Sequence, residues 1–269
     1  MMIGDQPIAK LDTRTAREPD ANVVLAVKEL QAHDRTGLKS ITIADLDVRS
    51  GEIVGIAGIS GNGQKEFLEV LAGQRPRNGG EVSVKGTPYG ASRAESRDLN
   101  VRFIPEEPLR NACVPRMTVA ENLAFRTFDI SQSGKPMNWI DAAAIKSYAR
   151  RLVEQFKVKT ASLNSPIASL SGGNVQRAAL ARELVGEVDL LIVSNPCFGL
   201  DFSAVAEIRA RIMKARNQGA AVLLLSEDLD ELLELSDRIF VMSDGALVYE
   251  TPIAKANVQT IGAYMAGHH

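Results

Sequence analysis

A short apolar strand, a glycine-rich turn and a helix together constrain this chain more than any other stretch. Residues Ile53–Ala57 form an apolar run of the kind found in strands buried on both faces. Glycines follow at positions 58, 61 and 63, and residues Gln64–Leu71 then carry apolar side chains at helical spacing. Because backbone N–H groups and the helix N-terminus converge in such a turn, the stretch predicts a phosphate-binding loop.

This loop departs from the pattern G-x-x-x-x-G-K-[ST] at the two positions that carry most of its chemistry. Gln64 replaces the lysine that contacts phosphate, and Lys65 replaces the hydroxyl that binds Mg²⁺. A glycine-rich turn without a ligand therefore stays open as an alternative. The residues that we assign to nucleotide binding are Gly58, Ile59, Ser60, Gly61, Asn62, Gly63, Gln64, Lys65 and Glu66.

The composition of the chain narrows the classes of function. Its 269 residues, 45% of them hydrophobic, can bury one large core or a core with a subdomain. A net charge of −2 gives no case for a nucleic-acid partner. Cys113 and Cys197 are the only cysteines and lack metal-ligand spacing, so we expect no metal site, no disulfide and a reducing compartment.

The sequence also lacks the marks of a membrane-spanning protein. No uninterrupted apolar run approaches the roughly 18 residues that cross a bilayer, and no signal segment opens the chain. We therefore expect any membrane role to be peripheral.

The remaining pattern alternates between strands and helices, which predicts a largely parallel sheet flanked by helices. Two early strands beside the phosphate-loop strand indicate an antiparallel layer next to it. The strands that we expect are Val23–Leu30, Ser40–Val48, Glu81–Val84, Val101–Ile104, Leu190–Val193, Ala221–Leu225, Ile239–Met242 and Ala246–Glu250. The further helices are Val119–Phe128, Ala142–Phe156, Asn174–Leu184, Ser203–Asn217 and Leu229–Leu235.

Two other segments receive structural interpretations. Thr118 with Glu121 forms a capping-box pattern, and Asp141 stands where it can cap the next helix. The charged residues between Arg93 and Arg102 indicate a solvated loop. We expect Trp139 to anchor the packing of the helical region.

A second glycine pair stands directly before a predicted helix, in Leu170-Ser171-Gly172-Gly173-Asn174. Ser171 offers a hydroxyl, the glycines expose backbone N–H groups and the helix adds its dipole, which together make a second anion site. An ordinary serine N-cap followed by flexible glycines is the alternative. The segment resembles the LSGGQ signature of ABC ATPases, with Asn in place of Gln.

Further segments resemble the same family, over about residues 23–250. Leu190–Asn195 stands where the Walker B strand ends, and Gly199-Leu200-Asp201 resembles the D-loop. Ser226–Glu231 resembles the switch segment that usually carries histidine. These stretches are most similar to the C-terminal cassette of the two-cassette ATPases that drive bacterial monosaccharide and nucleoside importers. Gln64 is typical of the nucleoside-type branch.

The resemblance implies an α/β fold: an ABC-type P-loop ATPase core with a mixed or parallel sheet, flanking helices and an antiparallel β edge, plus a helical signature subdomain. It implies an ABC nucleotide-binding domain over residues 23–269, with the helical subdomain at approximately 106–185. Met2-Ile3-Gly4 resembles the end of a preceding cassette, so residues 1–22 are expected to be a linker or a remnant of that cassette.

The chain departs from the family pattern throughout its own ATP site. Ser194 replaces the Walker B aspartate, and Asn195 replaces the glutamate that activates water. Glu106 stands at the Q-loop glutamine and Glu227 at the switch histidine. With Gln64 and Lys65, these changes imply weak ATP binding and essentially no hydrolysis at this site.

The signature is the part that stays intact. In the family arrangement it faces the P-loop of a partner cassette, where Ser171, Gly172, Gly173 and Asn174 would complete an ATP site in trans. Asp201 would lie near the seam, and Mg²⁺ would sit in the partner's site. The implied partners are a catalytically complete second cassette, transmembrane permease subunits and, indirectly, a periplasmic or lipoprotein substrate-binding protein. The implied location is the cytoplasm, peripheral on the inner face of the cell membrane.

Two other functions remain open. One is a non-transport, nucleotide-gated interaction module, and the other is a pseudo-ATPase that binds no nucleotide. A self-sufficient P-loop kinase or GTPase is disfavoured by the signature segment.

Overall fold

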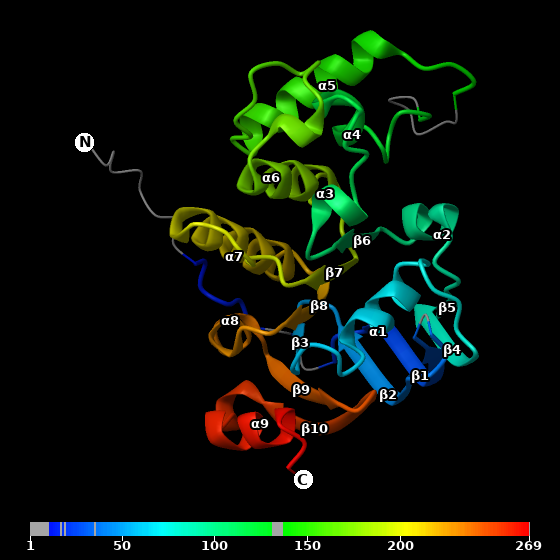
Figure 1. Ribbon diagram of the computed structural model, residues 1–269, viewed down its shortest axis with the longest axis vertical. Helices are drawn as coiled ribbons and strands as arrows, with labels where there is room; N and C mark the ends of the chain where they lie inside the picture. Colours follow the sequence, from blue (N-terminus) through cyan, green and yellow to red (C-terminus); the bar gives the residue numbers. More distant parts are fainter. Residues whose placement is uncertain (1–10, 17, 19, 35, 131–136, 269) are drawn as a thin grey trace. The chain divides into compact units, whose positions relative to one another are not determined.

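The computed structural model describes residues 11–16, 18, 20–34, 36–130 and 137–268. Backbone contacts divide the chain into two compact units. The first, here the core unit, holds the described residues up to Phe103 together with Val188–Cys197 and from Phe202 onward. The second, the helical unit, holds Ile104–Glu187 and Phe198–Asp201. Figure 1 labels the elements of both.

One mixed sheet forms the basis of the core unit. Its strand order is β5-β4-β1-β2-β10-β9-β3-β8-β7-β6. The strands are β1 (Val23–His33), β2 (Ser40–Arg49), β3 (Ile53–Ala57), β4 (Gly79–Val84), β5 (Thr87–Pro88), β6 (Val101–Ile104), β7 (Leu190–Ser194), β8 (Ala221–Ser226), β9 (Arg238–Ser243) and β10 (Ala246–Pro252). All eight predicted strands beyond the phosphate-loop strand are confirmed, with ends that differ by up to three residues.

The sheet combines a parallel and an antiparallel part. β3 pairs parallel with both β8 and β9, and β8 pairs parallel with β7. β1 pairs antiparallel with β2 and β4. β10 joins the two parts, because it runs antiparallel to β9 and makes one parallel pair with β2, at Ala246 and Thr42. The predicted antiparallel layer is therefore the edge of the same sheet.

The strand β3 lies in the middle of the parallel part, and all five of its residues are buried. A methyl group on Gly55 would come within 2.3 Å of the Ser236 hydroxyl, so only glycine fits there. Burial on both faces explains why β3 reads as an unbroken apolar run in the sequence.

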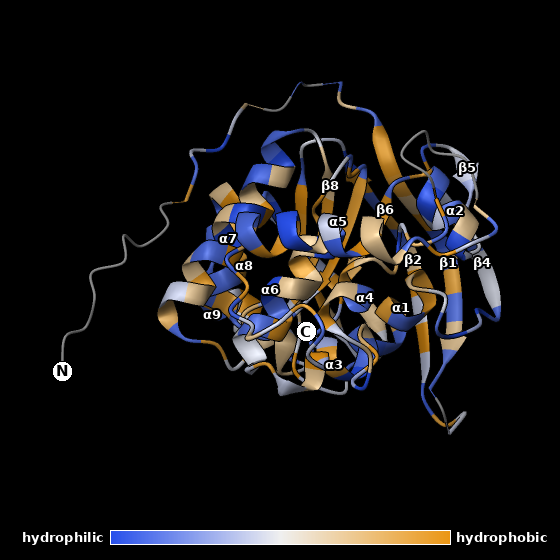
Figure 2. Cartoon of the chain, turned by 90° about the horizontal axis from the view of Figure 1, so that it is seen from above, coloured by the Kyte–Doolittle hydropathy of each residue, from blue (hydrophilic) through white to orange (hydrophobic). Residues whose placement is uncertain are grey.

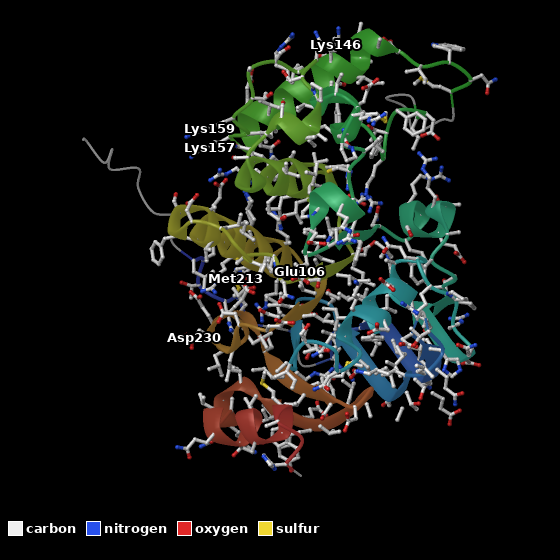
Figure 3. The ribbon with its side chains drawn as sticks, viewed as in Figure 1. Glu106, Lys146, Lys157, Lys159, Met213 and Asp230 are labelled. Atoms are coloured by element: carbon white, nitrogen blue, oxygen red, sulfur yellow. The ribbon has the colours of Figure 1, made fainter. Side chains whose placement is uncertain are left out.

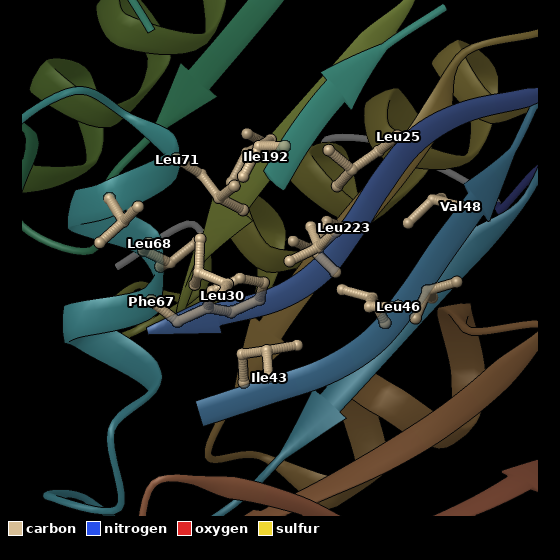
Figure 4. Packing of buried hydrophobic residues seen from close by; sticks show 14 of the residues in the cluster. Leu25, Leu30, Ile43, Leu46, Val48, Phe67, Leu68, Leu71, Ile192 and Leu223 are labelled. Carbon is tan, nitrogen blue, oxygen red and sulfur yellow. The ribbon is translucent and has the colours of Figure 1, made fainter. Parts of the chain in front are cut away.

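The helix α1 (Gln64–Leu71) follows the glycine-rich turn and covers part of the sheet. Its buried face contributes Phe67, Leu68 and Leu71 to a cluster that also contains Leu30 and Ile43 (Figure 4). Complete burial of each such side chain is worth about 1.5–3 kcal/mol. Figure 2 colours the residues by hydropathy, and strands such as β6 and β8 are hydrophobic whereas α2 is hydrophilic.

Among the described residues, four further helices belong to the core unit, and two of them differ from the prediction. The helix α2 (Arg93–Asp98) occupies a segment that we expected to be a loop; that expectation is wrong, because Ser92 and Glu95 form a capping box that starts a helix. The predicted helices α7 (Phe202–Asn217) and α8 (Leu229–Leu235) are confirmed. The helix α9 (Val258–Met265) was not predicted, and its Tyr264 ring stacks on Tyr249 of β10 at 4.4 Å.

The described part of the N-terminal segment is bonded to α7. The Asn217 side chain accepts from the Thr15 N–H at 3.2 Å and donates to the Thr13 carbonyl at 3.0 Å. Arg216 donates to the Thr15 carbonyl at 2.6 Å. Residues 13–15 are therefore held in a fixed place on the core unit. Met2-Ile3-Gly4 lies outside the described residues.

The helical unit contains α3 (Pro108–Asn111), α4 (Val119–Leu123), α5 (Ala142–Gln155), the short turn η1 (Ile167–Ser169) and α6 (Gly172–Glu183). The predicted caps are confirmed: Thr118 and Glu121 cap α4, and Asp141 caps α5 through the N–H groups of Ala143 and Ala144. α4 ends at Leu123, five residues before its predicted end, because the chain then continues in turns.

Trp139 does not anchor the helical packing. Its side chain is 71% exposed, so the expectation is wrong. The buried positions belong instead to aliphatic residues such as Leu123 and Leu152. Within the described residues of the whole chain, no helix has both the length and the apolar character needed to cross a membrane.

A buried ion-pair cluster fixes α6 within the helical unit. Glu183 is 2% exposed and accepts from Arg182 at 2.7 Å and from Arg126 at 2.6 Å. Burial alone would raise the pKa of the Glu183 carboxyl, but the two guanidinium groups outweigh it and hold that pKa below its ordinary value. Arg182 also donates to the Ala112 carbonyl at 2.7 Å.

We expect Glu183→Ala to lower the free energy of unfolding by about 3–5 kcal/mol, because it removes the carboxylate that pairs with the buried Arg182 and the partly buried Arg126. Because the folded-state pKa of Glu183 is lowered, its contribution is present above the unfolded pKa of about 4.3 and is lost as the pH falls through the folded value. Urea unfolding at neutral and acid pH measures this, with the exposed Glu154→Ala as control. Equal losses for both variants, or a Glu183 effect unchanged in acid, would contradict the prediction.

Candidate functional site

The glycine-rich turn between β3 and α1 has the backbone of a phosphate cradle. Gly61 and Gly63 have positive φ angles of 90° and 106°, which favour glycine. A methyl group on Gly63 would lie 2.6 Å from the Ile41 side chain and 2.9 Å from that of Met242. The turn therefore depends on glycine for both conformation and space, and Gly63 is the N-cap of α1.

Two side chains close this turn from within the core unit. The Gln64 amide donates to the Ile59 carbonyl at 3.1 Å and lies so close to Gly58 that a methyl group there would meet it at 2.0 Å. Lys39 donates to the Gly61 carbonyl at 3.3 Å. A neutral amide thus spans the loop at the position of the usual lysine, while Lys65 is exposed to solvent.

A hollow of about 230 Å³ lies beside the turn. Its other walls come from the start of β2 and from the turn between β9 and β10. The lining residues are Lys39, Ser40, Ile41, Gly61, Asn62, Gly63, Glu66, Asp244 and Gly245. The Gly245 N–H donates to the Asn62 carbonyl at 2.9 Å, which attaches the β9–β10 turn to the cradle.

Sequence reasoning missed Lys39 and the pair Asp244–Gly245 as parts of this site. Neither has a local signal that points to the phosphate loop, because their proximity comes from strand order in the sheet.

The carboxyl ends of β7 and β8 hold the second group of predicted positions. Asn195 follows Ser194 and has a φ of 39°, a left-handed conformation that Asn tolerates better than most residues. Its N–H donates to the Leu225 carbonyl at 2.8 Å, and its side-chain oxygen accepts from the Glu227 N–H at 2.9 Å. Asn195 therefore connects two strand ends.

Within the described residues, no group of three or more His, Cys, Asp or Glu side chains is placed to hold a metal ion. The positions expected to contact Mg²⁺ in a complete P-loop site carry Lys65 and Ser194. An ammonium group repels a divalent cation, so Lys65 suits a phosphate better than a metal ion.

The signature segment lies in the helical unit, at the start of α6. The helix begins at Gly172 and not at Asn174 as predicted, so both glycines belong to its first turn. N–H groups in a first turn lack acceptors within the helix. Ser171 and Gly172 are exposed, and a methyl group on Gly172 would meet nothing within 4 Å. The donors of this segment are open to a ligand.

Two further predicted residues belong to the helical unit. Asp201 is exposed at the end of the short segment Phe198–Asp201, and Leu200 of that segment lies 3.8 Å from the position of a methyl group on Gly173. Glu106 is also exposed, shortly after β6 (Figure 3). Their proposed roles at a nucleotide site stay predictions.

A scan against protein-family models gives a match to the family described as ABC transporter, over residues 41–197. That range is more than half of the chain. The chain therefore belongs to the ABC transporter family.

Curated relatives extend the match over nearly the whole chain. The chain is 38% identical to the glucose import ATP-binding protein TsgD13 of Haloferax volcanii, over 99% of the chain and 48% of that protein. It is 37% identical to the nucleoside import ATP-binding protein NupA of Lactococcus lactis, over 99% of the chain and 52% of that protein. It is 34% identical to the galactofuranose transporter ATP-binding protein YtfR of Escherichia coli K12, over 97% and 51%. The chain spans about half the length of these relatives.

Solved structures support the fold. A nucleotide-free ATP-binding cassette from an ABC transporter aligns with a TM-score of 0.72 at 18% identity, covering 90% of this chain and 99% of that one. An ATP-binding subunit of an ABC transporter aligns with a TM-score of 0.70 at 21% identity, covering 90% and 99%. The predicted fold class, an ABC-type P-loop core with a mixed sheet, is confirmed.

The cradle allows a test of its dependence on glycine. We expect Gly63→Ala to destabilise the chain by more than Gly61→Ala, because both have positive φ but only Gly63 is surrounded by side chains. A left-handed non-glycine residue costs roughly 1–2 kcal/mol, which applies to both variants, and the contacts with Ile41 and Met242 add to it for Gly63. Urea unfolding of the two variants measures the difference, and equal losses would contradict the geometry.

Proposed function

We propose that this chain is an ATP-binding cassette of an importer for a small sugar or a nucleoside, and that it acts by completing the ATP site of a partner cassette. The observation that carries this proposal is the open first turn of α6, with Ser171, Gly172 and Gly173 presenting donors, in a chain whose own P-loop lacks the usual catalytic side chains.

The chain's own site is proposed to bind ATP weakly. Its backbone cradle suits a chain of phosphates, which supports binding. Without the lysine, one charge-assisted contact of about 1.5–3 kcal/mol is missing. The Gln64 amide is instead engaged with the Ile59 carbonyl. ATP bound there would have no ligand set for its Mg²⁺ among the usual positions.

Hydrolysis at the chain's own site is proposed to be negligible. A positioned general base contributes roughly 10²–10⁴ to a rate, and the position of that base holds Asn195, whose side-chain oxygen is bonded to the Glu227 N–H. A carboxamide does not accept a proton near neutral pH. Glu227 is exposed and stands where histidine is usual.

The signature is proposed to act in trans. Ser171 and the N–H groups of Gly172 and Gly173 would donate to the terminal phosphate of an ATP held by a complete partner. Donors that are already in place when negative charge develops contribute strongly to catalysis. Asn174 would support them, Asp201 would lie near the seam, and Mg²⁺ would be held by the partner.

The relatives' names and lengths support the choice of substrate class and partners. They name glucose, nucleoside and galactofuranose transport, and each is about twice the length of this chain, which leaves room for a second cassette. We therefore propose a catalytically complete second cassette and membrane permease subunits as partners, with a substrate-binding protein acting indirectly. The location would be the cytoplasmic face of the membrane.

One observation favours a second candidate, a pseudo-ATPase that binds no nucleotide. The Ile59 and Gly61 carbonyls of the turn accept bonds from Gln64 and Lys39, so the chain's own side chains brace the turn. Equilibrium binding of a fluorescent ATP analogue to the chain separates the two. Saturable, weak binding supports the proposed function, and absence of binding at millimolar nucleotide supports the pseudo-ATPase.

We expect the purified chain to show no steady-state ATPase activity, and the activity of an added complete partner cassette to rise saturably with the concentration of the chain. Ser171→Arg would abolish the rise, because the long cationic side chain fills the open helix start. Ser147→Arg, which adds the same side chain to an exposed position of α5, is the control and would leave the rise intact. A high rate for the chain alone, insensitive to the partner, would contradict the proposal.

We also expect Asn195→Glu alone to leave the chain inactive. A carboxylate at this position supplies a base, but Gln64, Lys65 and Ser194 still lack the lysine, the hydroxyl and the aspartate of a complete site. A steady-state ATPase assay of this variant without a partner measures the effect. Robust turnover would mean that only the base is missing.

A further inference from the structure

The Asn174 side chain links two segments at the start of α6. Its oxygen accepts from the backbone N–H of Lys159 at 2.8 Å, and its nitrogen donates to the Ser171 hydroxyl oxygen at 2.8 Å. Lys159 lies in the segment after α5 and is labelled in Figure 3. All three residues belong to the helical unit, so the arrangement is independent of the core unit.

The partners of this amide fix which way it points. A backbone N–H only donates, so the amide oxygen must face Lys159 and the amide nitrogen must face Ser171. The Ser171 hydroxyl oxygen consequently acts as the acceptor in its bond with Asn174. Its own proton is then available to donate in another direction.

The surroundings of Ser171 leave its hydroxyl proton free to point toward solvent. Ser171 is exposed and is the N-cap of α6, yet its side chain does not cap the helix N–H groups. A hydroxyl that donated inward would turn lone pairs toward an approaching anion. A hydroxyl that accepts from Asn174 presents its proton instead, next to the N–H groups of Gly172 and Gly173.

We propose that Asn174 is a positioning residue, which holds the Ser171 hydroxyl with its proton directed outward so that Ser171 donates to the terminal phosphate of the partner's ATP. This inference rests on the proposed action of the signature in trans. The backbone N–H of Lys159 is the fixed point of the arrangement, because it orients the amide. On this account the Asn of the signature segment acts through Ser171 and does not itself touch the nucleotide.

The isosteric variant Asn174→Asp tests the direction of the hydroxyl. One carboxylate oxygen can still accept from Lys159, but the other can only accept, so the Ser171 hydroxyl must turn its proton inward. The loss of one charge-assisted bond predicts that the complex with the partner binds ATP on the order of 10- to 100-fold more weakly. The affinity for ADP, which lacks the terminal phosphate, is expected to fall much less.

Two controls separate positioning from added charge. Asn164→Asp places the same charge at another exposed position of the helical unit and is expected to change ATP and ADP binding little. In a Ser171→Ala background, Asn174→Asp is expected to weaken ATP binding no more than Asn164→Asp does. The hydroxyl that Asn174→Asp would reorient is absent from that background.

A structural readout that does not depend on nucleotide accompanies these measurements. Hydrogen exchange at the Lys159 amide is expected to stay slow in Asn174→Asp, which keeps an acceptor, and to become faster in Asn174→Ala, which removes it. Asn174→Ala frees the Ser171 hydroxyl to rotate, so its effect on ATP binding is expected to be smaller than that of Asn174→Asp.

The outcomes distinguish this inference from the proposed function. Selective loss of ATP binding in Asn174→Asp, abolished by Ser171→Ala and with the Lys159 amide still protected, supports the positioning role. An Asn174→Asp variant that behaves like Asn164→Asp, or an effect that persists without the Ser171 hydroxyl, overturns it while Ser171→Arg still blocks the partner's activity. If Ser171→Arg leaves the partner's activity unchanged, the trans role itself is overturned.

Discussion

The carboxylate of Asp237 connects three parts of the core unit at the start of β3. It accepts from the Ile53 N–H at 2.8 Å, pairs with Arg216 of α7 at 3.0 Å and contacts Arg14 at 3.4 Å. Arg216 is itself 4% exposed, so this carboxylate pairs with a buried charge. These bonds fix the position of the first residue of β3, and the burial of all five β3 residues fixes the strand within the sheet. The glycine-rich turn can therefore stand at one defined place beside β9 and β2.

Segments with a strong local pattern could be predicted from the sequence. β3 and α1 have the predicted bounds. The apolar run of β3 ends, and the helical repeat of α1 begins, at glycines that favour neither a strand nor a helix. The start of α6 was predicted two residues late, because glycine is a poor helix former and only the N-cap geometry of Ser171 shows that the helix has begun. α2 was missed because its charges obscured a capping box.

The residue types at the candidate site could be read from the sequence, but the contacts between them could not. The prediction that Gln64, Lys65, Ser194 and Asn195 replace the usual side chains of an ATP site comes from the sequence alone. That the Gln64 amide closes the turn on Ile59, or that Asn195 holds Glu227, depends on rotamers and on the order of strands in the sheet. The same is true of Lys39 and Gly245, which reach the turn from distant parts of the sequence.

On our proposal, the two glycine-rich segments of the chain have different functions. In the turn after β3, the side chains of Gln64 and Lys39 donate to the Ile59 and Gly61 carbonyls. The start of α6 keeps its donors open, with Asn174 orienting Ser171. On this proposal the first segment lacks catalytic groups, and the second segment serves the ATP site of another chain.

The most direct test identifies which chain holds the nucleotide that is turned over. The chain is mixed with a complete partner cassette and a photoreactive ATP analogue, the reaction is trapped with orthovanadate, and the labelled polypeptide is identified after irradiation and digestion. The account predicts trapped label on the partner only, and its loss when Ser171→Arg replaces the natural chain. Trapped label on the P-loop of this chain, between Gly58 and Glu66, would contradict it.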